Sequence, residues 1–129
     1  MSIEPDAGMT VLLTGLPSAG KTTLATATIT RLRGLGVAAE SLDGDEVRRM
    51  LWPELGMSRA DRERNLARVT VVARMLARNG VTAVISAIAP FETARRTMRE
   101  EHTGFGVPFV EVHVATPLTE CRRRDVKGL

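Results

Sequence analysis

Short apolar runs alternate along the chain with segments whose apolar residues recur every three or four positions. Apolar runs of this kind predict four β-strands, at residues 10–14, 37–42, 81–88 and 108–115. Helical spacing and end signals predict five helices, at residues 22–35, 46–51, 58–79 and 91–101 and from Thr116-Pro117 onward. Strands that alternate with helices predict an α/β fold with a mainly parallel sheet and right-handed crossovers.

Individual residues sharpen these predictions. The 81–88 run is almost unbroken, which is typical of a strand buried on both faces. Ser58, with Asp61 three residues later, is predicted to cap the long third helix. Two helices are given apolar faces by residues at helical spacing: Leu24, Ala25, Ile29 and Leu32 in the first, and Leu66, Val69, Val72, Ala73 and Leu76 in the third.

Length and composition limit the classes of protein. We expect residues 1–129 to form a single domain, large enough for one core but small for a complete nucleotide kinase. The net charge of +3 comes from basic residues interleaved with acidic ones, and only 3% of residues are aromatic, so no nucleic-acid partner is expected. No apolar run predicts a membrane segment. The single cysteine, Cys121, excludes an internal disulfide and indicates a cytoplasmic protein.

A glycine-rich motif follows the first predicted strand and opens the first helix. It reads Gly15-Leu16-Pro17-Ser18-Ala19-Gly20-Lys21-Thr22, followed by Thr23. Its glycines allow a tight turn whose backbone N–H groups point at phosphate oxygens, with the helix N-terminus behind them. Lys21 brings a cation to the β- and γ-phosphates, and the Thr22 hydroxyl is a ligand for Mg²⁺. The motif therefore predicts that ATP, with Mg²⁺, binds at residues 15–23.

Two further polar segments are predicted at the same edge of the sheet as this loop. Asp43-Gly44-Asp45 follows the second strand, and Ser86-Ala-Ile-Ala-Pro90 ends the third. Ligands of open parallel sheets bind outside the carboxyl ends of the strands. An Asp-Gly-Asp in this position is often only a turn, and helical arginines usually form solvated faces, so each segment alone is a weak indication. Their convergence on one edge is the stronger argument.

In these segments the chain resembles the adenylylsulfate kinases. The family's phosphate loop is similar to G-L-S-G-x-G-K-[ST]-T, and its second site to D-G-D-x-x-R, G-F-S-x-x-D-R-x-E-N and I-S-P. A later family segment, R-D-[PV]-K-G-L, is matched here by residues 124–129. The resemblance runs from about Gly8 to the last residue, in the family's order and spacing. It implies a P-loop NTPase-type three-layer α/β/α fold and transfer of the ATP γ-phosphate to the 3′-hydroxyl of adenosine 5′-phosphosulfate.

The resemblance also implies roles for individual residues. Asp45 is expected to orient the 3′-hydroxyl, to accept its proton, or to hold a water bound to Mg²⁺, and Lys21 is the second catalytic residue. Asp43 is expected to be the more structural member of the acidic pair. The full set expected at the acceptor is Asp43, Asp45, Arg48, Met57, Arg62, Asn65, Ile88, Ala89 and Lys127. Of these, Arg48 and Arg62 are matched to residues that bind the phosphosulfate, and Ile88 and Ala89 to backbone contacts.

The chain departs from the family at four places. Pro17-Ser18-Ala19 replaces Ser-Gly and a small residue, Met57 replaces a phenylalanine that stacks on the adenine, and Ala89 replaces a serine. The fourth departure is the end: relatives continue from the position of Leu129 into a basic lid and further core elements, and four strands are predicted where the family has five. These residues are therefore expected to be the N-terminal part of a longer domain. The resemblance further implies a homodimer, or fusion or association with an ATP sulfurylase, as candidate partners.

Two alternatives stay open from the sequence. The first is a related P-loop kinase that phosphorylates another small molecule, such as a sugar or an antibiotic, which Met57 favours. The second is a catalytically silent nucleotide-binding module, which the absent lid and Ala89 favour. Phe91 and Trp52 are interpreted as packing residues, and His102 and His113 as structural or surface residues without a metal role.

Overall fold

The computed structural model describes residues 8–15, 20–89 and 91–115. Their elements are β1 (Thr10–Thr14), α1 (Lys21–Gly34), β2 (Ala39–Asp43), α2 (Gly44–Leu51), α3 (Arg59–Arg78), β3 (Thr82–Ser86), α4 (Glu92–Thr103) and β4 (Phe109–His113). The order and type of these elements confirm the predicted strands and helices, with ends that differ by a few residues. The helix predicted from Thr116-Pro117, the break at Pro90, and Cys121 lie outside the described residues.

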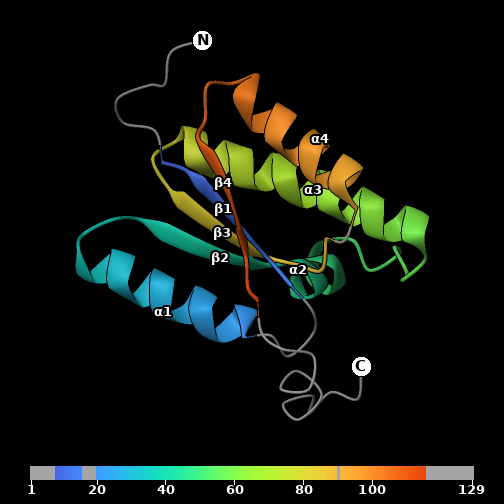
Figure 1. The fold of residues 1–129 in the computed structure, drawn as a ribbon, viewed down its shortest axis with the longest axis horizontal. Helices are drawn as coiled ribbons and strands as arrows, with labels where there is room; N and C mark the ends of the chain where they lie inside the picture. The colour runs from blue at the N-terminus through green and yellow to red at the C-terminus, as the bar shows by residue number, and fades with distance from the viewer. Residues whose placement is uncertain (1–7, 16–19, 90, 116–129) are drawn as a thin grey trace.

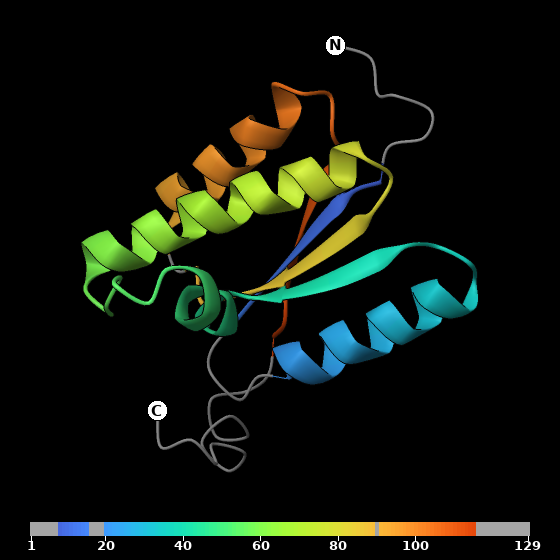
Figure 2. The same ribbon diagram turned by 180° about the vertical axis from the view of Figure 1, so that it is seen from behind.

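The four strands form one parallel sheet in the order β2-β3-β1-β4. Helix α1 covers one face of the sheet, and α3 and α4 lie side by side on the other (Figures 1 and 2). The arrangement is therefore three-layered, α/β/α, as predicted. Because all strands run in the same direction, their carboxyl ends meet at one edge, where α2 also begins.

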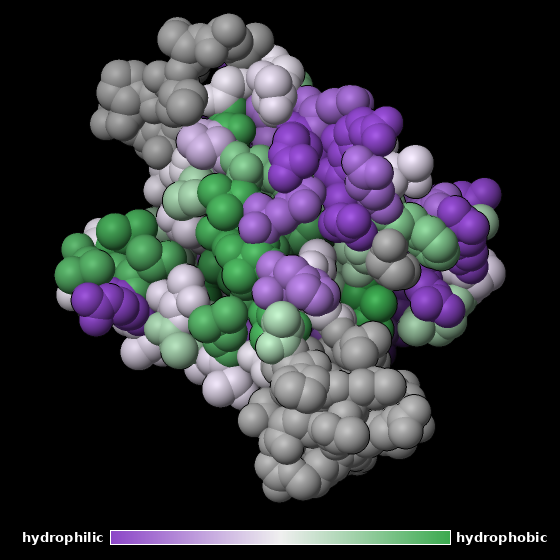
Figure 3. Space-filling model, in the orientation of Figure 1, coloured by the Kyte–Doolittle hydropathy of each residue, from purple (hydrophilic) through white to green (hydrophobic). Residues whose placement is uncertain are grey.

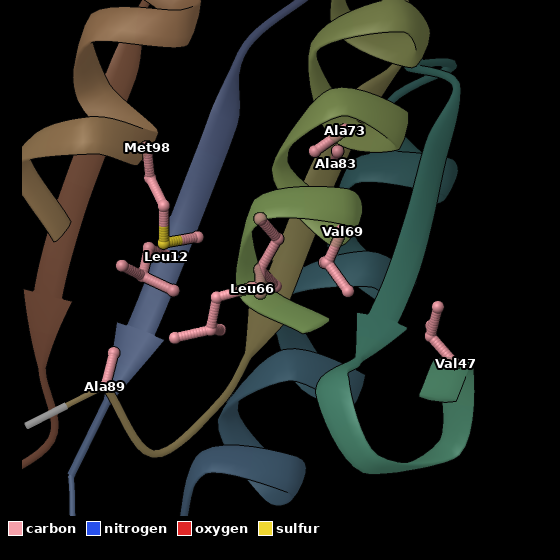
Figure 4. Close-up of a cluster of buried hydrophobic side chains, with 9 residues drawn as sticks. Leu12, Val47, Leu66, Val69, Ala73, Ala83, Ala89 and Met98 are labelled. Atoms are coloured by element: carbon pink, nitrogen blue, oxygen red, sulfur yellow. The ribbon is translucent and has the colours of Figure 1, made fainter. Parts of the chain in front are cut away.

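The larger core lies between the sheet and the α3–α4 layer. Leu12 and Ile85 from the strands, Val69 from α3 and Met98 from α4 are all buried there, and Figure 4 shows three of these side chains, with their neighbours, converging between the layers. β3 is buried along its whole length, as the unbroken apolar run predicts.

A smaller core lies between the sheet and α1. Its buried residues include Ala25 and Ile29 of α1, with Leu32 packed against them. The prediction that Leu24 belongs to this apolar face was wrong, because 39% of the residue is exposed. At about 3.6 residues per turn, Leu24 lies about 100° around the helix from Ala25 and about 140° from Ile29, so it does not share the face that these two residues turn to the sheet.

The surface is divided by layer. Hydrophilic residues gather over α4, whereas apolar surface runs down the middle of the face in Figure 3, where β4 lies in front. Val110 and Val112 of β4 are exposed apolar residues. No helix within the described ranges is long and apolar enough to cross a membrane.

His102 ties α4 to the sheet. Its ring is fully buried, with Nδ1 2.8 Å from the Met98 carbonyl oxygen and Nε2 2.7 Å from the Thr10 hydroxyl. The ring also packs on Phe109, with the centroids 4.8 Å apart. Burial lowers the pKa of His102 below its ordinary value, because it disfavours the charged imidazolium. The structural role predicted for this histidine is confirmed.

The buried imidazole makes stability depend on pH. Because the folded protein binds this proton less tightly than the unfolded chain does, unfolding takes up a proton as the pH falls below the ordinary pKa of 6.5. The free energy of unfolding should be fully retained above that pH and should fall as the pH drops toward the lowered pKa. Urea titrations at about pH 7.5 and about pH 5.5 measure the difference.

Two variants isolate the cause. His102→Gln should lose most of the pH dependence in this range, whereas His113→Gln, at an exposed position on β4, should keep it. An unchanged pH dependence in His102→Gln would show that another group is responsible.

Candidate functional site

The predicted site residues that the structure describes gather at the carboxyl edge of the sheet. Strand register aligns Asp43 at the end of β2 with Ser86 at the end of β3, and Ser86 in turn with Leu13 of β1. Gly15 follows β1 directly, so the start of the phosphate motif lies beside these residues. The convergence predicted from the sequence is therefore present for the Asp43 and Ser86 segments and for the start of the glycine loop.

Both glycines of the phosphate motif adopt conformations that favour glycine. Gly15 has φ 148° and Gly20 has φ 103°, and Gly20 is the N-cap residue of α1. No side chain among the described residues caps that helix, and its first turn has no acidic residue. The N-terminus of α1 thus keeps donors and positive potential for an anion. Leu16, Pro17, Ser18 and Ala19 lie outside the described residues.

Lys21 spans the two ends of this motif. Its ammonium group donates a hydrogen bond to the Gly15 carbonyl oxygen at 2.7 Å. The cation is therefore held across the loop, where a bound polyphosphate would lie. Thr22 and Thr23 are exposed in the same first turn of α1.

The two aspartates of the acidic pair have different surroundings. Asp43 caps α2, because its Oδ1 accepts hydrogen bonds from the backbone N–H groups of Asp45 at 3.1 Å and Glu46 at 3.0 Å. The side chain of Asp45 is 48% exposed and forms ion pairs with Arg48, at 2.8 Å, and with Arg49. The geometry thus gives Asp43 a structural contact and leaves the Asp45 carboxylate near solvent.

Arg48 is directed toward Asp45. Its Nη1 donates to the Leu55 carbonyl oxygen at 3.0 Å, while its Nη2 binds Asp45. The Nε atom is buried without a hydrogen-bond partner among the described residues. An unpaired buried donor is costly unless a ligand or water satisfies it, so Arg48 retains capacity for one more acceptor.

The loop before α3 is fixed by that helix. Ser58 caps α3 through the Asp61 backbone N–H at 3.1 Å, as predicted, and Asp61 accepts the Gly56 N–H at 2.8 Å. That backbone hydrogen bond is the main reason that the pKa of Asp61 is lowered. Arg62 Nε donates to the Met57 carbonyl oxygen at 2.8 Å. The Met57 residue itself is 58% exposed.

Asn65 connects α3 to α2. Its Nδ2 donates to the Gly44 carbonyl oxygen at 2.9 Å, and its Oδ1 accepts the Trp52 indole N–H at 2.6 Å. Asn65 is buried, so both ends of its amide are used inside the protein. In this structure the amide positions the start of α2, and with it Asp45. Trp52 packs against the larger core, in agreement with its predicted packing role.

A cavity of about 120 Å³ opens between α3 and the segment that follows β3. Its lining comprises Arg59, Arg62, Glu63, Leu66, Ile88, Ala89, Phe91 and Ala94. Three predicted acceptor residues, Arg62, Ile88 and Ala89, are thus brought to one cavity. Met57 and Asn65 are not among the lining residues, and Lys127 lies outside the described part of the chain.

Sequence reasoning did not select Arg59, Glu63 or Phe91 as site residues. Phe91 was interpreted as packing, and an arginine and a glutamate at the start of a long helix look like an ordinary solvated face. The available signal was the position of Phe91, directly after the Ile88–Pro90 segment at the sheet edge. Nothing in the sequence marks Arg59 as its neighbour.

The described residues contain no group of three or more histidine, cysteine, aspartate or glutamate side chains that could hold a metal by themselves. Thr22, exposed in the first turn of α1, and Asp45, in the first turn of α2, nevertheless carry hard oxygen donors. Mg²⁺ usually takes one or two such protein ligands and completes its shell with phosphate oxygens and water. The donor set therefore fits a magnesium ion that arrives with a nucleotide.

A family model described as adenylylsulphate kinase matches residues 7–129. An adenylyl-sulfate kinase of Synechococcus sp. (strain JA-3-3Ab) is 48% identical over 95% of this chain and 67% of the relative. The chain thus spans about two thirds of that relative's length. Among solved structures, the APS kinase of Mycobacterium tuberculosis in complex with AMPPNP and APS is similar with a TM-score of 0.92 and 42% identity, over 96% of this chain and 72% of that one. A hexameric APS kinase from Thiobacillus denitrificans is similar with a TM-score of 0.77 and 44% identity, over 85% of this chain and 22% of that one.

Proposed function

The chain belongs to the adenylylsulfate kinase family, and we propose that it transfers the γ-phosphate of ATP to the ribose 3′-hydroxyl of adenosine 5′-phosphosulfate. The products are ADP and 3′-phosphoadenosine 5′-phosphosulfate. The observation that carries this proposal is the placement of a phosphate loop and an arginine-lined cavity at one edge of a parallel sheet. The similar APS kinase of M. tuberculosis is solved with AMPPNP and APS together, which supports a donor and an acceptor for this chain.

The phosphate loop is the proposed donor site. Residues 15–23, including the four that are not described, would surround the ATP phosphates with backbone N–H groups. The Lys21 ammonium, held across the loop, would neutralise charge on the β- and γ-phosphates as the bridging bond breaks. Thr22 would hold Mg²⁺, with Asp45 contributing through a water molecule, and this ion supplies further charge neutralisation when it is bound.

Asp45 is the proposed general base that accepts the proton of the attacking 3′-hydroxyl. The 3′-oxygen forms a bond to the γ-phosphorus while the bond from that phosphorus to the bridging oxygen of ADP breaks. The hydroxyl proton passes to the Asp45 carboxylate, whose exposed position permits its later release to water. Arg48 and Arg49 would keep this carboxylate oriented, and Asn65 would hold the start of its helix.

The arginine-lined cavity is the proposed acceptor site. Arg62 lines it, and Arg48, which is paired with Asp45, keeps a buried Nε–H without a partner among the described residues, so both guanidinium groups are proposed to bind the anionic phosphosulfate. Ile88 and Ala89 would contribute the far wall. Asp43 would support the site through its helix cap, and Met57 and Lys127 would contact the acceptor.

Several wider expectations belong to the same proposal. We treat residues 1–129 as part of one kinase domain, because the described strands form a single sheet with a core on each face. A homo-oligomer is proposed on the likeness to the hexameric APS kinase, and association with an ATP sulfurylase on the family resemblance alone. A cytoplasmic location is proposed because the reaction consumes ATP.

A coupled assay of ADP release from ATP and Mg²⁺ tests the proposed function. With adenosine 5′-phosphosulfate present, the chain is expected to release ADP; without it, release should stay at the background rate. A panel of sugars and other hydroxyl acceptors in the same assay separates the related-kinase alternative. ATP binding without release for any acceptor would instead favour a silent nucleotide-binding module.

Arg62→Ala is expected to raise the apparent KM for the sulfonucleotide far more than the KM for ATP. A guanidinium bound to a charged oxyanion contributes about 1.5–3 kcal/mol, so the acceptor KM should rise roughly 10- to 100-fold. Steady-state kinetics with each substrate varied in turn measure the two effects. Arg64→Ala, in which an exposed arginine paired with Asp61 is removed from the same turn, is the control and should change neither KM. Equal effects of Arg62→Ala on both substrates would contradict an acceptor role.

A further inference from the structure

One wall of the arginine-lined cavity is the backbone segment that follows β3. Ile88 and Ala89 line the cavity there, and Phe91 lines it on the other side of Pro90. Ala89 is only 3% exposed and is drawn among the core side chains in Figure 4, whereas Ile88 is 43% exposed. Ile88 and Ala89 lie between the end of β3 and the start of α4. The hydrogen bonds of strands and helices therefore do not fix this wall, and its position depends on contacts with side chains.

Arg95, near the N-terminus of α4, makes such a contact. Its Nη1 donates a hydrogen bond to the Ala89 carbonyl oxygen, and its backbone N–H donates to the Phe91 carbonyl oxygen at 3.3 Å. One residue thus binds the backbone on both sides of Pro90. The positive end of a helix dipole disfavours a cation at this end of α4, so helix stability does not explain an arginine here. The hydrogen bond to Ala89 does.

The Arg95 guanidinium is itself held from β4. Glu111 Oε2 lies 3.9 Å from Arg95 Nε, and Glu111 Oε1 lies 3.1 Å from Arg99 Nη2. Strand register aligns Glu111 with Leu12, which belongs to the larger core, so the glutamate faces the layer of α3 and α4. The side chains of Arg95 and Glu111 are only 25% and 26% exposed. These contacts form a continuous line from β4 through Arg95 to the cavity wall.

We propose that Arg95 is a positioning residue for the acceptor, which fixes the Ala89 backbone at the cavity wall, and that Glu111 in turn fixes Arg95. This inference rests on the proposed function, in which the acceptor contacts the backbone of Ile88 and Ala89. The hydrogen bond from Arg95 sets the direction in which the Ala89 peptide presents its remaining polar groups. A displaced wall would weaken acceptor binding and misalign the attacking hydroxyl. The phosphate loop follows a different strand, β1, so ATP should bind as before.

The test is steady-state kinetics of the full chain and its variants, with adenosine 5′-phosphosulfate and ATP varied in turn. Arg95→Met keeps the apolar stem but removes the guanidinium, so kcat/KM for the acceptor should fall roughly 10- to 100-fold, the scale expected when a reacting group is displaced by up to about 1 Å. The KM for ATP should not change. Arg95→Lys keeps a cationic donor and should recover part of the loss.

Glu111→Gln tests the outer part of the line. It should lower kcat/KM for the acceptor less than Arg95→Met does, because the hydrogen bond to Ala89 remains. The double variant Arg95→Met/Glu111→Gln should lose no more than Arg95→Met alone, because Glu111 acts on the wall through Arg95.

The chain offers two matched controls. Arg96 is the next residue of α4, and its exposed side chain pairs with Glu92, so Arg96→Met should change neither KM. Arg74 forms a less exposed ion pair of 3.2 Å with Glu101, toward the other end of α4. Arg74→Met should lower the Tm but leave the KM for the acceptor unchanged. The comparison separates a role in positioning from a general loss of stability.

Amide hydrogen exchange gives a readout that does not depend on activity. The backbone amides of Ile88 and Ala89 should exchange faster in Arg95→Met than in the unchanged chain, and at the unchanged rate in Arg74→Met. If Arg95→Met does not fold, Arg95→Lys and Glu111→Gln decide the question by the same criteria. Acceptor kinetics equal to those of the unchanged chain, or equal losses for acceptor and ATP, would overturn this inference and leave the proposed function standing. No acceptor-dependent ADP release by the unchanged chain would overturn the proposed function and this inference with it.

Discussion

Asp45→Asn is expected to lower turnover about 10²- to 10⁴-fold while ATP binding stays nearly unchanged. The amide keeps the shape of the carboxylate but cannot accept the proton of the 3′-hydroxyl as the bond to phosphorus forms. Because Asp45 is on α2 rather than in the phosphate loop, the ATP phosphates should bind as before. The coupled ADP-release assay gives turnover, and calorimetry with a non-hydrolysable ATP analogue gives binding.

A neighbouring substitution separates this effect from a general change of charge. Glu46→Gln removes one negative charge from the next position of the same helix turn, where the side chain is exposed. It should keep most of the turnover. Asp45→Ala should resemble Asp45→Asn, with some additional loss of stability because Arg48 and Arg49 lose their ion-pair partner. Full activity in Asp45→Asn would remove this residue from the chemical step.

Lys21→Ala is expected to weaken ATP binding and to lower turnover together. The ammonium group would contact the phosphates in the ground state and would neutralise more charge in the transition state, so kcat should fall about 10²- to 10³-fold. The same substitution removes the contact with Gly15 that joins the two ends of the loop. Titration of ATP and measurement of ADP release test both parts of this expectation.

The other end of α1 provides the control for Lys21. Arg31→Ala also removes one positive charge from α1, in its last turn and far from the phosphate loop. It should change neither ATP affinity nor turnover. If Lys21→Ala lowered turnover with unchanged ATP affinity, the ammonium would act in the transition state alone; if neither changed, the loop would not be the donor site. Lys21→Arg tests whether a charge of different shape is sufficient.

Local sequence determined most of the architecture. Apolar runs and helical spacing identify all four strands and the four described helices, because burial of these elements is encoded in neighbouring residues. Ser58 and Asp43 are capping residues whose hydrogen bonds reach only two or three positions along the chain, so Ser58 is readable as a cap without a structure. The glycine motif is likewise local, and its two glycines have the backbone angles that such a loop requires.

Only the tertiary structure determined the contacts between elements that are distant in the sequence. The sequence does not show that the Asn65 amide donates a hydrogen bond to Gly44 and accepts one from Trp52. Nor does it show that Leu24 is exposed rather than packed on the sheet. It could not join Arg59 to Phe91 either, since one begins α3 and the other precedes α4. Periodicity specifies which face of an element is apolar, but the packing of α3 against α4 and the register of the strands specify which polar side chains meet at the edge. The phosphate loop could therefore be predicted from the sequence. The residues that line the cavity were determined by the packing of α3 and α4 on the sheet.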